Sequence, residues 1–372
     1  MDYTVNLRAT SVVDLSGDGS VAAGDFTSSP STGNRAGFRA PVASLPFGNS
    51  EVLKLPGPSG RRQAWGISPD GNFVVGTIGL PPTISDQRAA RWDASAGLTP
   101  ERFDDPAGLD VFLSVAEDVA NDGTSVGWVR SGGASGPIQP YRWLADGTPQ
   151  ELALLPNATS VFARAHGISG DGSHLAGVGR SDDPAGLNVA VRWVDGVPEN
   201  LGTLPSDLLS WGWDLSLDGS TVVGWSGLGT TTTREAIRWV EGVGMTSLGA
   251  LPGSVGSGEA LSVSADGSVV VGFGTTSGGE EAFIWDEVHG MRSVEEVLSG
   301  LGLGPDLSGW SLERATGLSA DGLTLAGTGI DPNGIEKGWI ATVPEPGTGS
   351  LLVSGLLVLA RAKRRVSVQR SS

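Results

Sequence analysis

Seven aspartates, each followed by glycine, are the most regularly placed residues in this chain that could carry out acid–base or metal chemistry. They follow one another at spacings of 52, 52, 49, 47, 48 and 55 residues: Asp18, Asp70, Asp122, Asp171, Asp218, Asp266 and Asp321. Carboxylates can transfer protons or bind calcium through their oxygens. A fixed period of this length is also typical of a repeat architecture. The seven copies are therefore either a set of sites or a set of structural turns.

The first copy has the oxygen ligands of a calcium loop, but the other copies do not keep them. Asp14, Ser16 and Asp18 alternate as in an EF-hand loop, with a further Asp at the twelfth position. In the copy that begins at Asp214, the twelfth residue is Trp225. A turn explains all seven copies and calcium explains one, so the sequence predicts no metal site.

Each Asp–Gly pair is expected to form the turn of a β-hairpin. An apolar branched residue stands three positions before every one of these aspartates, and a short apolar run ending in glycine follows, as in Val74-Val75-Gly76. Asp–Gly suits a turn that needs a positive φ, because glycine has no Cβ and aspartate tolerates that conformation. The seven aspartates are therefore predicted to be structural.

Two further strands are predicted after each hairpin. The third carries an aromatic signature, such as Ala90-Arg91-Trp92, and Gly37-Phe38-Arg39 fills this place in the first copy. The fourth is expected in segments that end in proline, such as 200–205 and 247–252. Four short strands in about fifty residues make one propeller blade. The recurring Trp is expected to fill the space between neighbouring blades.

The sequence thus predicts an all-β fold, a seven-bladed β-propeller over residues 1–343, followed by a C-terminal membrane-associated helical tail over 344–372. The last copy has no fourth strand, so residues 2–7 are expected to complete its blade and close the ring. One helix is expected from Met291 to Leu301, where Val and Leu recur at helical spacing.

Little else in the sequence points to catalysis. His166 occupies a slot five residues before its aspartate that other copies fill with Trp65 or Glu117, which indicates a tolerated variant. A metal pair with His174 across the hairpin is the alternative, and His289 lies in a turn. No Gly-x-Ser-x-Gly elbow is followed by Asp and His partners. We predict no catalytic residue and no cofactor.

Charge and cysteine content exclude several classes of protein. The residues before Pro344 carry a formal net charge of −21, because the tail holds five of the basic residues and one Glu. Such an acidic body repels phosphate backbones, so no nucleic-acid partner is expected. The absence of Cys from the sequence excludes a thiol nucleophile, a disulfide and a Cys-based zinc site.

The C-terminal residues differ in composition from the repeats. Residues 347–360 contain no charge, and a basic cluster follows that includes Arg361, Lys363, Arg364 and Arg365. Fourteen residues are short for a full membrane span. Basic residues beside an apolar segment stay on the cytoplasmic side. This order favours a membrane-associated tail with a cytoplasmic basic anchor, and a peripheral helix is the alternative.

Pro344, Glu345 and Pro346, the apolar segment and the basic end resemble the PEP-CTERM sorting signal of exopolysaccharide-producing Gram-negative bacteria. The resemblance implies that an exosortase, an integral-membrane transpeptidase, processes the chain near this motif. It implies as partners the exosortase, the export machinery and, before processing, the inner membrane. The protein would then be released to the cell surface or the extracellular matrix.

The repeats resemble the HAF family of extracellular repeats, whose copies carry an apolar-Ser-x-Asp-Gly hairpin followed by glycine. The segment Leu307-Ser308-Gly309-Trp310 also resembles the usual C-terminal copy of that family. The family has no established activity. A PEP-CTERM protein should begin with a secretory signal peptide, and residues 1–7 contain no apolar region of that kind. We therefore expect the true start to lie upstream of Met1, and a vestigial tail is the alternative.

The sequence predicts an exported surface or matrix protein that acts as an interaction or structural module associated with exopolysaccharide, and not an enzyme. The alternative is a secreted carbohydrate-active enzyme that uses carboxylates at the propeller axis. A third possibility is a matrix filler without a specific ligand. Nearly identical copies without one chemically distinctive copy favour binding or structure over catalysis.

Overall fold

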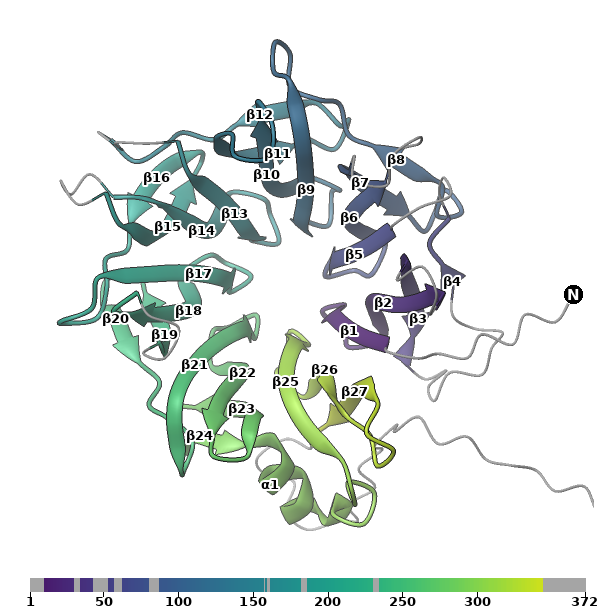
Figure 1. Cartoon of the computed structure of the whole chain (residues 1–372), viewed down its shortest axis with the longest axis vertical. Coiled ribbons are helices and arrows are strands. Elements are labelled where there is room, and N and C mark those ends of the chain that lie inside the picture. Colours follow the sequence, from purple (N-terminus) through teal and green to yellow (C-terminus); the bar gives the residue numbers. More distant parts are fainter. Residues whose placement is uncertain are drawn as a thin grey trace, which may run out of the picture.

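The computed structural model describes residues 10–29, 34–42, 53–56, 62–79, 87–156, 158, 161–181, 186–229 and 234–343. These residues form a seven-bladed all-β propeller, as predicted. Figure 1 views the ring down its shortest axis, with the first strand of every blade nearest the centre. The predicted sorting motif Pro344–Pro346, the basic anchor and residues 2–7 lie outside the described residues.

Each blade is an antiparallel sheet whose strands follow one another in sequence from the axis outward. Blades 1 to 3 consist of β1 (Thr10–Leu15), β2 (Val21–Ser29), β3 (Asn34–Pro41), β4 (Leu53–Lys54); β5 (Arg62–Ile67), β6 (Phe73–Gly79), β7 (Gln87–Asp93), β8 (Pro100–Arg102); and β9 (Val111–Val119), β10 (Ser125–Ser131), β11 (Ile138–Trp143), β12 (Pro149–Glu151).

Blades 4 to 6 repeat this order, and blade 7 has three strands among the described residues. The strands are β13 (Ala163–Ile168), β14 (His174–Arg180), β15 (Asn188–Val194), β16 (Val197–Asn200); β17 (Leu209–Leu215), β18 (Thr221–Gly227), β19 (Arg234–Val240), β20 (Gly244–Ser247); β21 (Ser254–Val263), β22 (Val269–Thr276), β23 (Gly279–Asp286), β24 (Gly290–Ser293); and β25 (Ser311–Leu318), β26 (Thr324–Ile330), β27 (Glu336–Thr342).

The fourth strands end earlier than the sequence predicted. β16 ends at Asn200 and β20 ends at Ser247, where the predicted strands 200–205 and 247–252 begin. The Leu side chains of these segments are buried instead in the connection to the next blade, as Leu201 and Leu248 show. Their apolar pattern comes from packing against the next blade and not from strand pairing.

Two further sequence predictions need correction. The helix expected over Met291–Leu301 is α1 (Val294–Leu298), which continues as the π-helical turn η2 (Ser299–Leu303). Met291 belongs to β24, and Ser293 caps the helix by accepting a hydrogen bond from the Glu296 N–H. In blade 1, Ala40 and not Arg39 occupies the place of the recurring Trp, since Ala22 pairs with Ala40 as Val74 pairs with Trp92.

An apolar cluster lies at each interface between neighbouring blades. The Trp of the third strand contributes to most of these clusters, and Trp92, Trp143, Trp193 and Trp339 are fully buried. Trp92, for example, packs with Leu55 of the preceding blade. Phe38 of blade 1 packs with Ile340 of blade 7, so the ring is closed by the same kind of contact. Each blade thus buries its faces against two neighbours.

Candidate functional site

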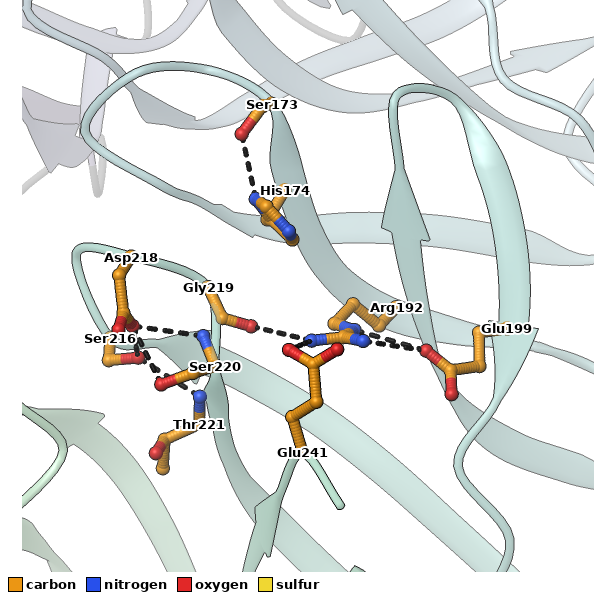
Figure 2. A network of polar contacts seen from close by, with 10 residues as sticks. All are labelled: Ser173, His174, Arg192, Glu199, Ser216, Asp218, Gly219, Ser220, Thr221 and Glu241. Carbon is orange, nitrogen blue, oxygen red and sulfur yellow. Dashed lines mark hydrogen bonds and ion pairs between the residues drawn. The ribbon is translucent and has the colours of Figure 1, made fainter.

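The seven Asp–Gly pairs lie in the turns between the first and second strands of the blades, and together they define one face of the ring, called here the turn face. In blade 5, Ser216 Oγ donates to Asp218 Oδ1 (2.7 Å) and accepts from the Thr221 N–H (3.0 Å). The same carboxylate oxygen accepts from the Ser220 N–H (2.9 Å), as Figure 2 shows. The turn aspartate is therefore occupied by its own backbone.

Only the glycine of each pair has a positive φ, between 66° and 86°, while the aspartate does not. The turn is a longer loop than the two-residue hairpin that the Asp–Gly pattern suggested, because the serine two residues earlier closes it. The hydrogen bonds also stabilise the carboxylate form. Contacts from Ser173 lower the pKa of Asp171 to about 2.

Arginines of the third strands tie some of these turns to the preceding blade. In Figure 2, Arg192 of blade 4 donates to the Gly219 carbonyl of the blade 5 turn (3.0 Å) and forms ion pairs with Glu199 and Glu241. Arg39 and Arg91 make the same bond to Gly71 and Gly123 of their next blades. The aspartates of the turns and the arginines that clamp them therefore already have structural hydrogen-bond partners.

The turn face closes around the axis through backbone hydrogen bonds from blade to blade. The Ala320 N–H donates to the Gly17 carbonyl, and the Gly17 N–H donates to the Pro69 carbonyl, both at 2.7 Å. Three more such bonds join blades 4 to 7 through Gly170, Leu217, Ala265 and Ala320. The cavity next to this ring has a volume of only about 90 Å³.

A larger axial cavity of about 260 Å³ lies farther from the turns and receives residues from the first strand of every blade. Each of these strands contains a β-bulge at one position, five residues before the turn aspartate. A bulge re-aims a side chain. The seven bulge residues line the cavity, and all differ except two Trp: Val13, Trp65, Glu117, His166, Trp213, Leu261 and Thr316.

The position after the bulge carries aspartate in blades 1, 3 and 5, and these carboxylates also line the axial cavity. Asp118 accepts from the Val119 N–H of its own strand (2.7 Å) and from the Ile168 N–H of the next blade (3.0 Å). Asp14 and Asp214 do the same for Ile67 and Val263. Each aspartate thus joins two first strands at a bulge.

These three carboxyl groups are poorly solvated and repel one another. Burial raises the pKa of Asp14 to about 7 and that of Asp214 to about 6. Burial also raises the pKa of Asp118 well above its ordinary value, and the charges of Asp14 and Asp214 add to the effect. The backbone hydrogen bonds act in the opposite direction and do not offset burial.

Glu117 and His166 come from neighbouring blades and lie next to each other on the wall of the axial cavity. Glu117 Oε1 accepts from Trp128 Nε1 (2.8 Å), and it lies 3.9 Å from His166 Nδ1, too far for a direct hydrogen bond. Trp211 Nε1 lies 3.0 Å from His166 Nε2. Burial and the charge of Arg164 lower the pKa of His166 to about 3.

The imidazole is therefore neutral, and its tautomer follows from its neighbour. An indole N–H can only donate, so Nε2 of His166 is the acceptor and Nδ1 carries the proton. Within the described part of the chain, no acceptor lies within hydrogen-bond distance of this N–H. His166 is only 7% exposed and lines the cavity. The pair offers a buried donor beside a carboxylate acceptor.

Aromatic side chains surround this pair. Trp213 lies 4.6 Å from His166 between ring centroids and donates from Nε1 to Glu259 (3.1 Å), which also pairs with Arg234. Trp65 of blade 2 is 39% exposed, although it belongs to a strand that is otherwise largely buried. Among the described residues that line the cavity there is no Lys or Arg.

The sequence analysis predicted none of these residues as a site. It interpreted the slot of His166 as a tolerated variant, and the structure places that slot on the wall of the cavity. The signal was present: chemically different side chains stand at one position in seven copies that are otherwise alike. Its meaning depended on the bulge, which the sequence pattern does not reveal.

The other histidines and the aspartates of the calcium-like segment do not come together in one site. His174 Nδ1 lies 2.7 Å from Ser173 Oγ beside the next turn, and His289 contacts Asp286. The three aspartates of the segment that resembles an EF-hand loop each have backbone partners. Asp14 accepts a hydrogen bond from the Leu15 N–H, Asp18 accepts one from the Ser20 N–H in its turn, and Asp25 accepts one from the Ala64 N–H. Over the described ranges, no three His, Asp or Glu side chains are grouped so that they could hold a metal ion.

No helix in the described part of the chain has the length and apolar character needed to cross a bilayer. The predicted anchor residues Arg361, Lys363, Arg364 and Arg365 lie outside this part.

No protein-family model matches the chain, and no curated protein matches it. Solved structures do. The β-propeller domain of the Trilobed protease from Pyrococcus furiosus has a TM-score of 0.56 at 10% identity, over 95% of this chain and 98% of that one. Puromycin hydrolase has a TM-score of 0.59 at 14% identity, over 98% of this chain and 55% of the hydrolase. A puromycin-hydrolyzing peptidase from Mycobacterium tuberculosis has a TM-score of 0.54 at 17% identity, over 97% of this chain and 54% of the peptidase. The chain spans about half of the two hydrolases, and at these identities the likeness shows the fold alone.

Proposed function

We propose that this propeller is an interaction module that binds a carbohydrate in its axial cavity. The observation that carries the proposal is the pair Glu117 and His166, which lie 3.9 Å apart between Trp65 and Trp213 on the cavity wall. The ligand we propose is of the class that the sequence led us to expect, an exopolysaccharide.

A sugar hydroxyl has the chemistry that the pair lacks. It can accept from the Nδ1–H of His166 and donate to Glu117 at the same time, with each contact near about 2.8 Å. A hydroxyl bound in this position would make two hydrogen bonds, each worth roughly 0.5–1.5 kcal/mol. A ligand with a single charge would satisfy one member of the pair and oppose the other.

The indoles supply the apolar part of the site. Trp rings bury large flat surfaces and keep a polar edge free for hydrogen bonding. The C–H faces of a sugar ring fit such surfaces, while its hydroxyl groups point outward to polar partners. Trp65 is accessible for this contact, and Trp213 is held in place by Glu259.

A carbohydrate-active enzyme remains the second candidate, and one observation favours it. A general acid for glycoside cleavage needs a raised pKa, and burial raises the pKa of Glu117 as well as those of the three axial aspartates. The aspartates, however, already accept two backbone N–H bonds each. A binding module therefore fits the geometry better.

The experiment measures binding of the full chain to bacterial exopolysaccharides by calorimetry, with release of reducing ends recorded in parallel. Trp65→Ala should weaken binding by about 10- to 100-fold, since it removes a stacking face worth roughly 1–3 kcal/mol. Phe112→Ala is the matched control, because Phe112 is also 39% exposed but does not line the cavity. Equal effects of the two substitutions would contradict the site, and saturable binding with cleavage would favour the enzyme.

The place of action is proposed from the tail. Pro344, Glu345 and Pro346, the uncharged segment and the basic end support processing by an exosortase and delivery to the cell surface. The mass of the chain recovered from the surface of its native cell tests this part. A surface form that still carries residues 344–372 would speak against it.

A further inference from the structure

The interface between blades 6 and 7 has no arginine clamp on the turn face, and blade 7 likewise has Ile340 at the clamp position. Where Arg39, Arg91 and Arg192 clamp the turn of the next blade, blade 6 has Ile284. Ile284 pairs with Val271 as Arg192 pairs with Ala176, so the two positions are equivalent. An isoleucine has no donor for the turn carbonyl at Gly322. The place of a charged clamp is thus apolar here.

A groove of about 830 Å³ opens at this interface. We call it the blade 6–7 groove and define it by the apolar residues Ile284, Trp285, Val297, Leu301, Leu323 and Val343. Val297 and Leu301 come from α1 and η2, which lie beside blade 7 in Figure 1. At the rim, Val288 is 86% exposed. An apolar hollow of this size on a protein surface indicates an interaction site.

The last described residue, Val343, is part of the groove wall. Another 29 residues follow it in the sequence, and 347–360 contain no charge and are rich in Leu and Val. Only three residues separate Val343 from this segment. The short tether gives the segment a high effective concentration at the groove, which an unlinked partner does not have.

Charge complements this contact. The groove is bordered by Asp266, Asp286, Glu287, Glu296 and Asp321, against Arg238, Arg292 and His289. The apolar segment is followed by the basic cluster 361–365. An acidic border next to the groove and a basic end next to the segment attract each other when the segment is docked.

We propose that the blade 6–7 groove is the docking site of the chain's own apolar segment, residues 347–360. The groove covers this segment while it is attached to the propeller. The docking is independent of the carbohydrate site, which lies on the axis and is formed by other residues.

The absence of native Cys allows a direct test in the full chain. One variant combines Val288→Cys at the groove with Ser354→Cys in the segment. The matched control replaces Val288→Cys with Val243→Cys, because Val243 is also highly exposed (74%) and lies in the same hairpin loop of blade 5. Under mild oxidation, the Val288 pair should form an intramolecular disulfide at least about ten times faster than the control pair.

A third variant separates docking from mere tethering. Leu356→Asp with Leu357→Asp, added to the Val288/Ser354 pair, leaves the propeller unchanged and should slow the disulfide by about tenfold, because charged side chains oppose apolar docking. Equal rates in all three variants would overturn the proposal. Disulfides between two chains, seen as dimers without reductant, would overturn it in favour of a second copy.

Discussion

At the scale of single residues, the axial aspartates combine a structural role with an electrostatic cost. Each one joins two first strands through backbone N–H donors, and burial raises the pKa of each. The charges of Asp14 and Asp214 raise the pKa of Asp118 further. A carboxyl whose pKa is higher in the folded than in the unfolded chain binds its proton more tightly when folded. Its contribution to stability is therefore present at low pH and is lost as the pH rises through the folded pKa.

This sign leads to a prediction for the pH dependence of unfolding. The free energy of unfolding should fall between about pH 4, the unfolded pKa of Asp, and about pH 7, by on the order of 1 kcal/mol per pH unit for each titrating carboxyl. Burial raises the pKa of Asp14 to about 7 and that of Asp214 to about 6, and these values set the upper end of the range. Urea unfolding at several pH values measures the slope.

Asp118→Asn should reduce this slope by about one proton, since it removes one of the coupled groups. Asp171→Asn is the control: its pKa is lowered to about 2, so it stays ionised throughout the window. A slope that is unchanged by Asp118→Asn, or equally changed by Asp171→Asn, would show that the axial carboxyls do not titrate in this range.

At the scale of elements, the hydroxyl of the serine two residues before the turn aspartate helps to close the repeated hairpin. Six copies have Ser at this position, and blade 3 has Ala120. The serine hydroxyl donates to the turn aspartate and accepts from the strand that follows. A turn with Ala lacks both bonds.

Substitution at this position should change stability strongly in blade 5 and little in blade 3. Ser216 is fully buried, so Ser216→Ala should lower the free energy of unfolding by roughly 1–3 kcal/mol. Ala120→Ser should change it by less than about 0.5 kcal/mol, because the turn of blade 3 is one residue shorter and the Thr124 N–H already donates to Asp122. Chemical denaturation of both variants measures the difference. Equal effects of the two substitutions would contradict the role of the serine hydroxyl.

At the scale of the whole molecule, the ring is closed by side-chain packing between blade 7 and blade 1. Phe38 and Ile340 pack there as Phe283 packs with the neighbouring blade 5. The first residue of β1, Thr10, also pairs with Lys337 of β27. The closing interface therefore has the same construction as the internal ones among the described residues.

Because the closing interface is built like an internal one, the same substitution should cost the same stability at both. Phe38 and Phe283 occupy equivalent third-strand positions and are both fully buried. Phe38→Ala and Phe283→Ala should each lower the free energy of unfolding by about 3–5 kcal/mol, with one cooperative transition in both variants. Calorimetry measures this. A separate early transition in Phe38→Ala alone would mean that blades 7 and 1 part before the rest unfolds.

Much of the fold could be predicted because it repeats. The period of the Asp–Gly turns, the apolar residue before each turn and the Trp of the third strand indicated the blade count and the interfaces. The fourth strands were placed too late because buried Leu in a connection, such as Leu201, has the same pattern as a strand residue. The helix was too long because Met291 pairs as part of β24.

The site could not be predicted in this way. His166, Glu117 and Trp65 stand at a fixed distance from their turns, but nothing in that spacing shows that a bulge directs them toward the axis. Asp14, Asp118 and Asp214 are about one hundred residues apart and become neighbours only across the ring. The blade 6–7 groove likewise needed the comparison of one interface with another.

The sequence by itself determined the seven turns and the propeller they imply, because turns and strand periodicity are local and each copy repeats the same local rule. Only the tertiary structure decided which carboxyl groups are buried and have a raised pKa. The aspartates that repeat most regularly, at the turns, are hydrogen-bonded near solvent. The less regular side chains five and four positions earlier meet at the axis, where ring closure brings seven strands around one cavity and removes water from them.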